Sequence, residues 1–279
     1  MLNYKHVAYI AGGTIIAISI VLAVTFSAQP QETDNSGNNV DMIGNGKDVS
    51  EVQSMEVGYA SGANGFLAAP LQNGTYPGIV MIHEWWGLND NIKEMATQMA
   101  AEGYVVLAAD LYNGAVATES SQAGMLAGQV RDNPDAAINN LQAAVSFLKA
   151  HESVRADSIG SLGWCFGGGW SLQLALNEEL QATGIYYGNL VSDPSELSSI
   201  DWPVLGVFGS ADSSIPVEQV RAFEQALGEN GISSEIYVYE GLGHAFANPS
   251  GANYAPDATM DAWQKTLSFF ERHLKEQSA

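Results

Sequence analysis

Apolar and polar positions follow two alternating patterns from about residue 55 to the end of the chain. Short runs such as residues 77–83 are apolar almost throughout, which is typical of strands buried on both faces. The stretches between them repeat apolar residues at the 3.6-residue period of amphipathic helices. This alternation predicts an α/β fold in which helices cover both faces of a mostly parallel sheet. The predicted strands comprise residues 55–60, 65–70, 77–83, 104–109, 158–164, 183–187, 204–208 and 234–239, and the predicted helices residues 90–102, 121–130, 134–150, 168–177, 217–228 and 258–275.

The N-terminal segment has a different pattern. Residues 7–26 are apolar or small and uncharged, and 20 residues at helical rise can cross the hydrocarbon core of a bilayer. We predict that residues 1–26 form a membrane anchor with the catalytic domain extracytoplasmic, because Lys5 precedes the apolar run. A secretory signal is the alternative, since residues 21–23 and 25–27 would each suit cleavage. In that case the domain is secreted.

Residues 27–54 separate this segment from the predicted domain. They are rich in Gln, Asn, Asp, Gly and Ser and contain few large apolar residues. Such a composition cannot bury enough apolar surface to offset the entropy of ordering the chain. We therefore expect a flexible polar linker, followed by one folded domain over residues 55–279.

Composition narrows the class of partner. Ten Lys and Arg stand against 31 Asp and Glu, a formal net charge of -21, which argues against a nucleic-acid partner because phosphates would be repelled. No cluster of ligand residues predicts a metal site and no phosphate-binding motif is present, so we expect no cofactor. Cys165 is the only cysteine and cannot form an internal disulfide. In an exported domain, such a cysteine is either buried or reactive.

The surroundings of Cys165 favour the reactive alternative. Residues 163–167 read Gly-Trp-Cys-Phe-Gly, between a predicted strand and a predicted helix. This is the pattern of a nucleophile elbow, whose tight turn requires small flanking residues and exposes the nucleophile at the sheet edge. The N-terminus of the following helix favours a thiolate. The alternative is a buried structural cysteine in a glycine-rich turn.

Three further reactive side chains follow predicted strands. They are Glu84, Asp212 and His244, and with Cys165 they have the chain order of the α/β-hydrolases: nucleophile, acid, histidine. A thiol needs a base, a role for His244, and the imidazole needs its tautomer and orientation fixed, a role for Asp212. Each could instead be an ordinary loop residue: a turn cap, a surface histidine, or an acidic residue before a helix. Their joint order and placement favour catalysis.

The predicted turn also supplies groups for an oxyanion and a pocket. The backbone N–H groups of Phe166 and Trp85 are the expected oxyanion-hole donors. Aromatic residues near the strand ends would form apolar walls around the thiol, although such residues are as often plain core. The expected wall residues are Trp86, Tyr112 and Phe246, together with Trp85 and Phe166. His83 is a weaker candidate, because it should point to the face of its strand opposite Glu84.

Five segments together resemble the dienelactone hydrolase family over residues from about 55 to 273. They are Ile-His-Glu-Trp-Trp-Gly-Leu-Asn at 82–89, Asp-Leu-Tyr at 110–112, Gly-Trp-Cys-Phe-Gly-Gly at 163–168, Tyr-Tyr-Gly at 186–188 and Gly-His-Ala-Phe at 243–246. The resemblance implies an α/β-hydrolase fold and a Cys165–Asp212–His244 triad. It also implies that Glu84 contacts the thiol of the free enzyme and helps to activate it when substrate binds.

The chain departs from the family at the two positions that bind the substrate carboxylate. The best-studied members hold a substrate carboxylate with two arginines, and the corresponding positions here are Gly114 and Asn248. We expect Asn248 to line the substrate pocket and the substrate to differ from the dienelactone carboxylate. The sequence thus predicts hydrolysis of a small-molecule ester or lactone through a thioester acyl-enzyme. Acyl transfer to another acceptor and a non-catalytic binding or scaffold protein are the alternatives.

Overall fold

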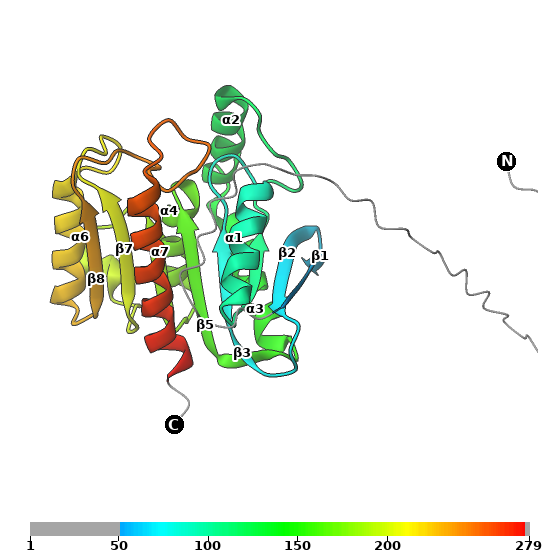
Figure 1. Cartoon of the computed structure of the whole chain (residues 1–279). Coiled ribbons are helices and arrows are strands. Elements are labelled where there is room, and N and C mark those ends of the chain that lie inside the picture. The colour runs from blue at the N-terminus through cyan, green and yellow to red at the C-terminus, as the bar shows by residue number, and fades with distance from the viewer. Residues whose placement is uncertain (1–50, 277–279) are drawn as a thin grey trace, which may run out of the picture. The chain divides into compact units, whose positions relative to one another are not determined.

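The computed structural model describes residues 51–276, in which the strands form one eight-stranded sheet (Figure 1). The strand order is β1-β2-β4-β3-β5-β6-β7-β8. The β1–β2 and β2–β4 pairs are antiparallel, and all other pairs are parallel. The strands are β1 (Val52–Ala60), β2 (Ala63–Pro70), β3 (Tyr76–Ile82), β4 (Val105–Ala109), β5 (Val154–Trp164), β6 (Ala182–Tyr186), β7 (Val204–Gly209) and β8 (Ser234–Tyr239).

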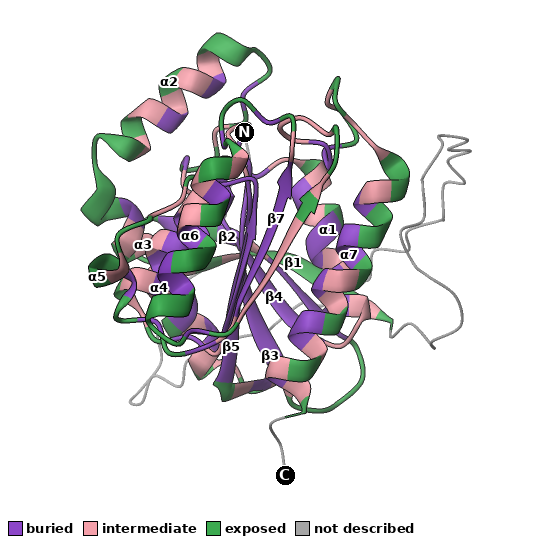
Figure 2. Cartoon of the chain, turned by 90° about the vertical axis from the view of Figure 1, so that its left-hand side faces the viewer, coloured by how far each residue is buried: buried purple, intermediate pink, exposed green. Residues whose placement is uncertain are grey.

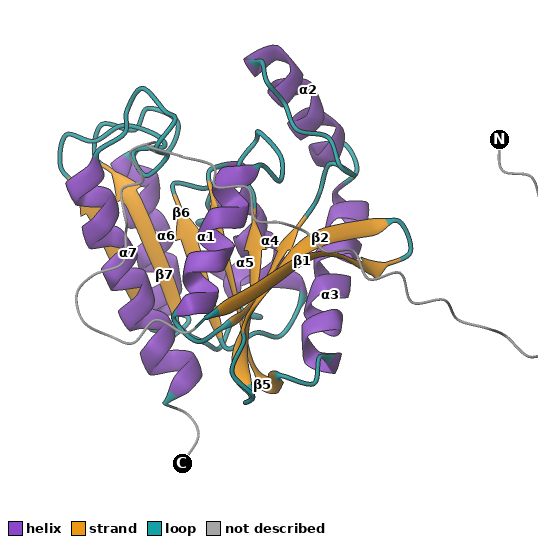
Figure 3. Ribbon diagram, turned by 45° about the vertical axis from the view of Figure 1, so that its right-hand side comes forward, coloured by secondary structure: helices purple, strands orange, loops and turns teal. Residues whose placement is uncertain are grey.

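Helices cover both faces of this sheet (Figures 2 and 3). One face carries α1 (Asp90–Ala101) and α7 (Pro256–Phe270), and α7 continues into a π-helical turn, Glu271–Lys275. The other face carries α3 (Pro134–Ala150), α4 (Phe166–Asn177) and α6 (Val217–Glu229). Every residue of β4, β6 and β7 is buried, because helices pack on both sides of these strands. The prediction of an α/β fold with a mostly parallel sheet is confirmed.

Local signals set several element ends. The Asn89 side chain accepts a hydrogen bond of 3.2 Å from the Ile92 backbone N–H, which caps α1. Pro134 occupies the first turn of α3, where its missing N–H would have no helical partner. Both signals depend only on residues within one helical turn of the helix start.

Several element boundaries differ from expectation. β1 begins at Val52 rather than at residue 55, β5 begins at Val154, and α4 begins at Phe166, directly after Cys165. A short helix, α5 (Pro194–Leu197), was not predicted. β1 pairs with only one strand and is largely exposed, so its hydrophobic period is weak. Its boundary depends on pairing with β2, where Val52 lies opposite Pro70.

The predicted anchor or signal segment, residues 1–26, lies outside the described residues, as does most of the predicted linker. Among residues 51–276, no helix combines the length and the apolar character that a membrane span requires.

The parallel strands direct their carboxyl ends to one edge of the sheet, the upper edge in Figure 1. The helix α2 (Ser120–Arg131) stands at this same edge. Loops after β3, β5, β7 and β8 therefore converge there, and these loops contain the predicted reactive residues.

Candidate active site

Cys165 occupies a strained turn between β5 and α4. Its φ and ψ angles are 54° and −115°, a conformation that L-residues rarely adopt and that surrounding structure must enforce. A Cβ on Gly163 would lie 2.1 Å from the Gly167 carbonyl oxygen, and one on Gly167 would lie 2.2 Å from the Ile82 carbonyl oxygen. Both distances are too short for any side chain. The glycines thus allow the close approach of β3, β5 and α4 that positions the cysteine.

His244 connects Cys165 to Asp212. Its Nε2 lies 3.1 Å from Cys165 Sγ, and its Nδ1 lies 2.7 Å from Asp212 Oδ2. The Asp212 carboxylate is buried, and its Oδ1 accepts the backbone N–H groups of Ser214 and Ile215 at 2.8 and 3.1 Å. These donors fix the carboxylate, which in turn fixes the imidazole. In this arrangement Nδ1–H donates to the carboxylate, and Nε2 is free to accept the thiol proton.

Two further groups hold the His244 loop in place. The Asn253 side chain donates a hydrogen bond of 2.9 Å to the His244 carbonyl oxygen. The ring of Tyr187, which follows β6 and has a φ of 35°, packs edge-to-face on the imidazole with centroids 5.2 Å apart. Tyr187 belongs to the Tyr-Tyr-Gly segment at 186–188, but its position in the sequence indicated no role for it. Its contact with His244 depends on loops that are distant in the sequence.

Glu84 is buried beside Cys165 and is paired with Asn248. The Asn248 Nδ2 donates to Glu84 Oε2 at 2.5 Å, and both side chains are buried. Burial raises the pKa of Glu84 from its usual value of 4.5 to about 7, and the hydrogen bond from Asn248 opposes this shift. The amide of Asn248 is thus engaged by a protein carboxyl group, whereas the sequence predicted that it would line the substrate pocket.

The Cys165 thiol is held neutral by its surroundings. Burial raises its pKa to about 12, and the nearby Glu84 carboxyl adds to this effect. The backbone N–H groups of Phe166 and Trp85 act on the sulfur in the opposite direction and lower its pKa. The two expected oxyanion donors therefore both act on the Cys165 sulfur.

His83 takes a larger part in the site than its sequence position suggested. The side chain is fully buried, with Nδ1 2.6 Å from the Glu84 carbonyl oxygen and Nε2 3.2 Å from the Leu111 backbone nitrogen. Its ring stacks on Phe166 with centroids 5.7 Å apart and meets Tyr112 edge-on at 4.6 Å. The only sequence signal for this residue was its place directly before Glu84.

The predicted aromatic walls divide into two groups. Trp85 and Trp86 are partly exposed and meet edge-to-face, with centroids 5.1 Å apart, in the loop after β3. Tyr112 is buried, and its hydroxyl donates a hydrogen bond of 3.1 Å to the Trp85 carbonyl oxygen. Phe246 is fully buried and packs on the rings of Tyr187 and Tyr239, so it belongs to the core around the His244 loop.

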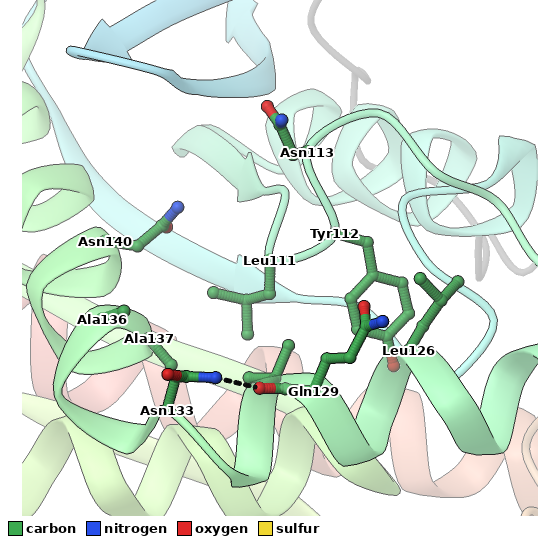
Figure 4. Close-up of a pocket in the computed structure, with 10 residues that line it drawn as sticks. Leu111, Tyr112, Asn113, Leu126, Gln129, Asn133, Ala136, Ala137 and Asn140 are labelled. Carbon is green, nitrogen blue, oxygen red and sulfur yellow. Dashed lines mark hydrogen bonds between the residues drawn. The ribbon is translucent and has the colours of Figure 1, made fainter.

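Tyr112 also borders a cavity of about 400 Å³ between α2, α3 and the loop after β4 (Figure 4). Leu126, Val130 and Ala137 contribute apolar surface, and Gln129 contributes a carboxamide. All ten lining residues are uncharged. Within residues 51–276, no group of three or more His, Cys, Asp or Glu is placed to hold a metal ion.

The chain is similar in sequence and in structure to proteins of one known family. The model of the dienelactone hydrolase family matches residues 63–274. Protein usf of Aquifex pyrophilus is 31% identical over 217 residues, which cover 75% of this chain and 93% of that protein. A protein of Synechocystis sp. that carries the provisional name carboxymethylenebutenolidase is 30% identical over 227 residues, covering 76% of this chain and 92% of that protein. The solved structure named m3DLH superposes with a TM-score of 0.74 at 26% identity, covering 80% of this chain and 99% of that one.

Proposed function

Because the chain belongs to the dienelactone hydrolase family and is a hydrolase of the ester or lactone type, we propose that it cleaves an uncharged ester or lactone with Cys165 as nucleophile. The observation that carries this proposal is the continuous chain of hydrogen-bond contacts from Cys165 Sγ through His244 to Asp212. The thiol must lose its proton before the sulfur can attack, and His244 Nε2 is placed to accept that proton.

Acylation proceeds through His244. Its Nε2 takes the proton from Sγ as the sulfur attacks the carbonyl carbon of the ester, and Asp212 stabilises the imidazolium that forms. The carbonyl oxygen becomes an oxyanion, which the backbone N–H groups of Phe166 and Trp85 bind. The imidazolium then returns its proton to the leaving alcohol as the C–O bond breaks, which leaves a thioester on Cys165.

Deacylation repeats these steps with water. His244 Nε2 takes a proton from water as its oxygen attacks the thioester carbon, and the same two N–H groups bind the second oxyanion. Collapse breaks the C–S bond, the sulfur recovers its proton from His244, and the carboxylic acid is released. For a lactone, the alcohol and the acid remain parts of one product.

Glu84 restrains the thiol in the free enzyme. When it is ionised, the Glu84 carboxylate disfavours a thiolate at Cys165, which protects the sulfur from oxidation and from reaction in the absence of substrate. Substrate binding would exclude water and change the surroundings of both groups. We therefore assign Glu84 a role in controlling when the thiol ionises.

Three features support an uncharged substrate. Asn248 stands where the best-studied members have an arginine, and its amide is engaged by Glu84. Gly114, at the second arginine position, has no side chain, and its backbone N–H donates to the Asp110 carboxylate. The net charge of -21 adds a repulsive field for anions. An arginine bound to a substrate carboxylate contributes about 1.5–3 kcal/mol, a term that these positions do not supply.

An activity screen over p-nitrophenyl esters and small lactones tests the proposed reaction, with Cys165→Ala as the blank. We expect a burst of p-nitrophenol equivalent to the cysteine content, loss of activity after iodoacetamide, and protection by substrate. Turnover at the wild-type rate in Cys165→Ala would place the chemistry elsewhere. Turnover only in the presence of an alcohol or amine acceptor would instead identify an acyltransferase.

Substrate charge is tested with a neutral ester and a carboxylate-bearing analogue of matched size, compared by kcat/KM at low and high salt. We expect the neutral compound to be preferred and Asn248→Arg to narrow or reverse the preference. A clear preference of the wild type for the anion would refute the proposal. Arg131→Ala would then be the next variant, because the charge of Arg131 acts on the Tyr112 hydroxyl beside the site.

For the N-terminal segment we propose membrane attachment through residues 7–26, with the domain extracytoplasmic. The support is the sequence alone: 20 uncharged, apolar or small residues that follow Lys5. Cell fractionation of the full chain should recover it with membranes, or secreted after cleavage. Recovery of uncleaved protein in the soluble cytosol would refute the proposal.

A further inference from the structure

We propose that His83 is a positioning residue that orients the Trp85 backbone N–H toward Cys165, and so builds one half of the oxyanion hole. This inference rests on the proposed function, in which that N–H binds the oxyanion. His83 itself does not touch the reacting atoms. It acts through the peptide unit that joins Glu84 to Trp85.

The geometry of that peptide unit makes the connection rigid. The Glu84 carbonyl and the Trp85 N–H belong to one planar group, and because the peptide is trans they point in opposite directions. His83 Nδ1 lies 2.6 Å from the carbonyl oxygen, while the N–H at the other end acts on the Cys165 sulfur and lowers the pKa of the thiol. Holding the oxygen therefore fixes the direction of the N–H.

The hydrogen bonds assign the tautomer of His83. The Leu111 backbone N–H donates to Nε2 at 3.2 Å, so Nε2 must carry a lone pair and the ring proton must be on Nδ1. Nδ1–H then donates to the Glu84 carbonyl oxygen. Burial lowers the pKa of His83, which keeps the ring neutral and keeps Nε2 as an acceptor.

A donor on the carbonyl also strengthens the N–H of the same peptide. Hydrogen bonds in series polarise one another, and the effect is larger in a buried site than in water. The Gly87 backbone N–H also reaches the Glu84 carbonyl oxygen, at 3.2 Å, and the Tyr112 hydroxyl holds the next carbonyl, that of Trp85, at 3.1 Å. Of these contacts, the one from His83 is the shortest.

His83 also contacts the residue that supplies the second donor. Its ring stacks on the Phe166 ring at an interplanar angle of 13°, and Phe166 contributes the other N–H directed at the sulfur. One buried side chain thus contacts the end of β3, the elbow and, through Leu111, the loop after β4. His83 thereby holds the backbone N–H groups of Trp85 and Phe166 in a fixed position relative to each other.

Two substitutions separate positioning from simple packing. His83→Leu removes both hydrogen bonds, whereas His83→Gln is uncharged and retains one donor and one acceptor. His151→Leu is the matched control, because His151 Nδ1 also accepts a backbone N–H, that of Ser153, in the turn after α3. Each protein is normalised to its folded fraction by circular dichroism and thermal unfolding.

The acylation rate, the affinity for a ketone inhibitor and the alkylation rate are then compared among these proteins. The acylation burst with p-nitrophenyl acetate passes through an oxyanion, and a small trifluoromethyl ketone forms a stable adduct that carries one. Alkylation by iodoacetamide only displaces iodide with sulfur and forms no oxyanion. Removing a whole oxyanion donor lowers turnover by about 10²–10³-fold, so we expect misorientation in His83→Leu to slow acylation roughly 10- to 100-fold.

In His83→Leu, the affinity for the ketone and the acylation rate should both fall. The alkylation rate should change by no more than about threefold, because the Trp85 N–H is the weakest of the influences on the pKa of the thiol. His83→Gln should recover acylation to within about fivefold of wild type, and His151→Leu should retain all three values. A parallel fall in all three for His83→Leu, or no fall in any, would overturn the inference.

Failure of the proposed function has a different signature. If the wild type releases no p-nitrophenol yet binds the ketone, ester hydrolysis is refuted, and the ketone series alone decides the role of His83. Equal ketone affinity in wild type and His83→Leu would then reject positioning.

Discussion

Replacing Glu84 by Gln tests the buried carboxyl group through the pH dependence of stability. Burial raises the pKa of Glu84 from 4.5 to about 7, against the opposing hydrogen bond from Asn248. Glutamine has nearly the same shape, can still accept from the Asn248 amide and does not titrate. The substitution therefore removes the ionisation of Glu84 while leaving the packing in place.

The sign follows from proton binding. Between pH 4.5 and about 7 the folded protein keeps a proton on Glu84 that the unfolded chain releases. The stabilisation from this group is complete below pH 4.5 and is lost as pH rises through about 7. At about 1.4 kcal/mol for each pKa unit, the free energy of unfolding falls by about 3 kcal/mol across this window.

Urea unfolding at a series of pH values from 4.5 to 8.5 measures the effect. The difference in unfolding free energy between Glu84→Gln and wild type should increase by about 3 kcal/mol from the lowest to the highest pH, in favour of the variant. Glu224→Gln, at an exposed position of α6, is the control for the change in net charge and should show no such trend. A flat difference for Glu84→Gln, or an equal trend in both variants, would refute the raised pKa.

Three other predictions address the same site. Cys165→Ala should reduce esterase activity to background and His244→Ala should reduce kcat by at least about a thousandfold, as measured with a p-nitrophenyl ester; activity near wild type in either variant would contradict the proposed triad. Asn248→Ala should raise the pKa of Glu84 further, because the donor that stabilises the carboxylate is lost. If the midpoint of its stability-versus-pH curve is unchanged or lower, the Asn248 amide does not lower the pKa of Glu84. Gly163→Ala should destabilise the fold and abolish iodoacetamide-sensitive activity, because its Cβ would lie 2.1 Å from the Gly167 carbonyl oxygen; an active variant of normal melting temperature would mean that the elbow is more tolerant than its geometry implies.

The order of elements and the position of the elbow could be predicted because they depend on neighbouring residues. Apolar runs determine buried strands through their period, and Gly163 and Gly167 mark the only kind of residue that fits the turn around Cys165. Parallel strands then bring their carboxyl ends together, so Asp212 and His244 were expected at the same edge as the cysteine. Their contacts in the structure agree with that expectation.

Tertiary structure alone decided where the supporting side chains point. Asn248 pairs with Glu84 across 164 positions of sequence, and no local pattern encodes such a contact. His83 was expected on the opposite face of its strand, but β3 ends at Ile82, and the turn that follows lets the imidazole meet both the Glu84 carbonyl and Leu111. Side-chain period is a property of regular backbone and loses its predictive value where the strand ends. The sequence by itself therefore determined that Cys165, Asp212 and His244 lie at one edge of the sheet, and the packing of distant loops determined which other residues join them and how each is held.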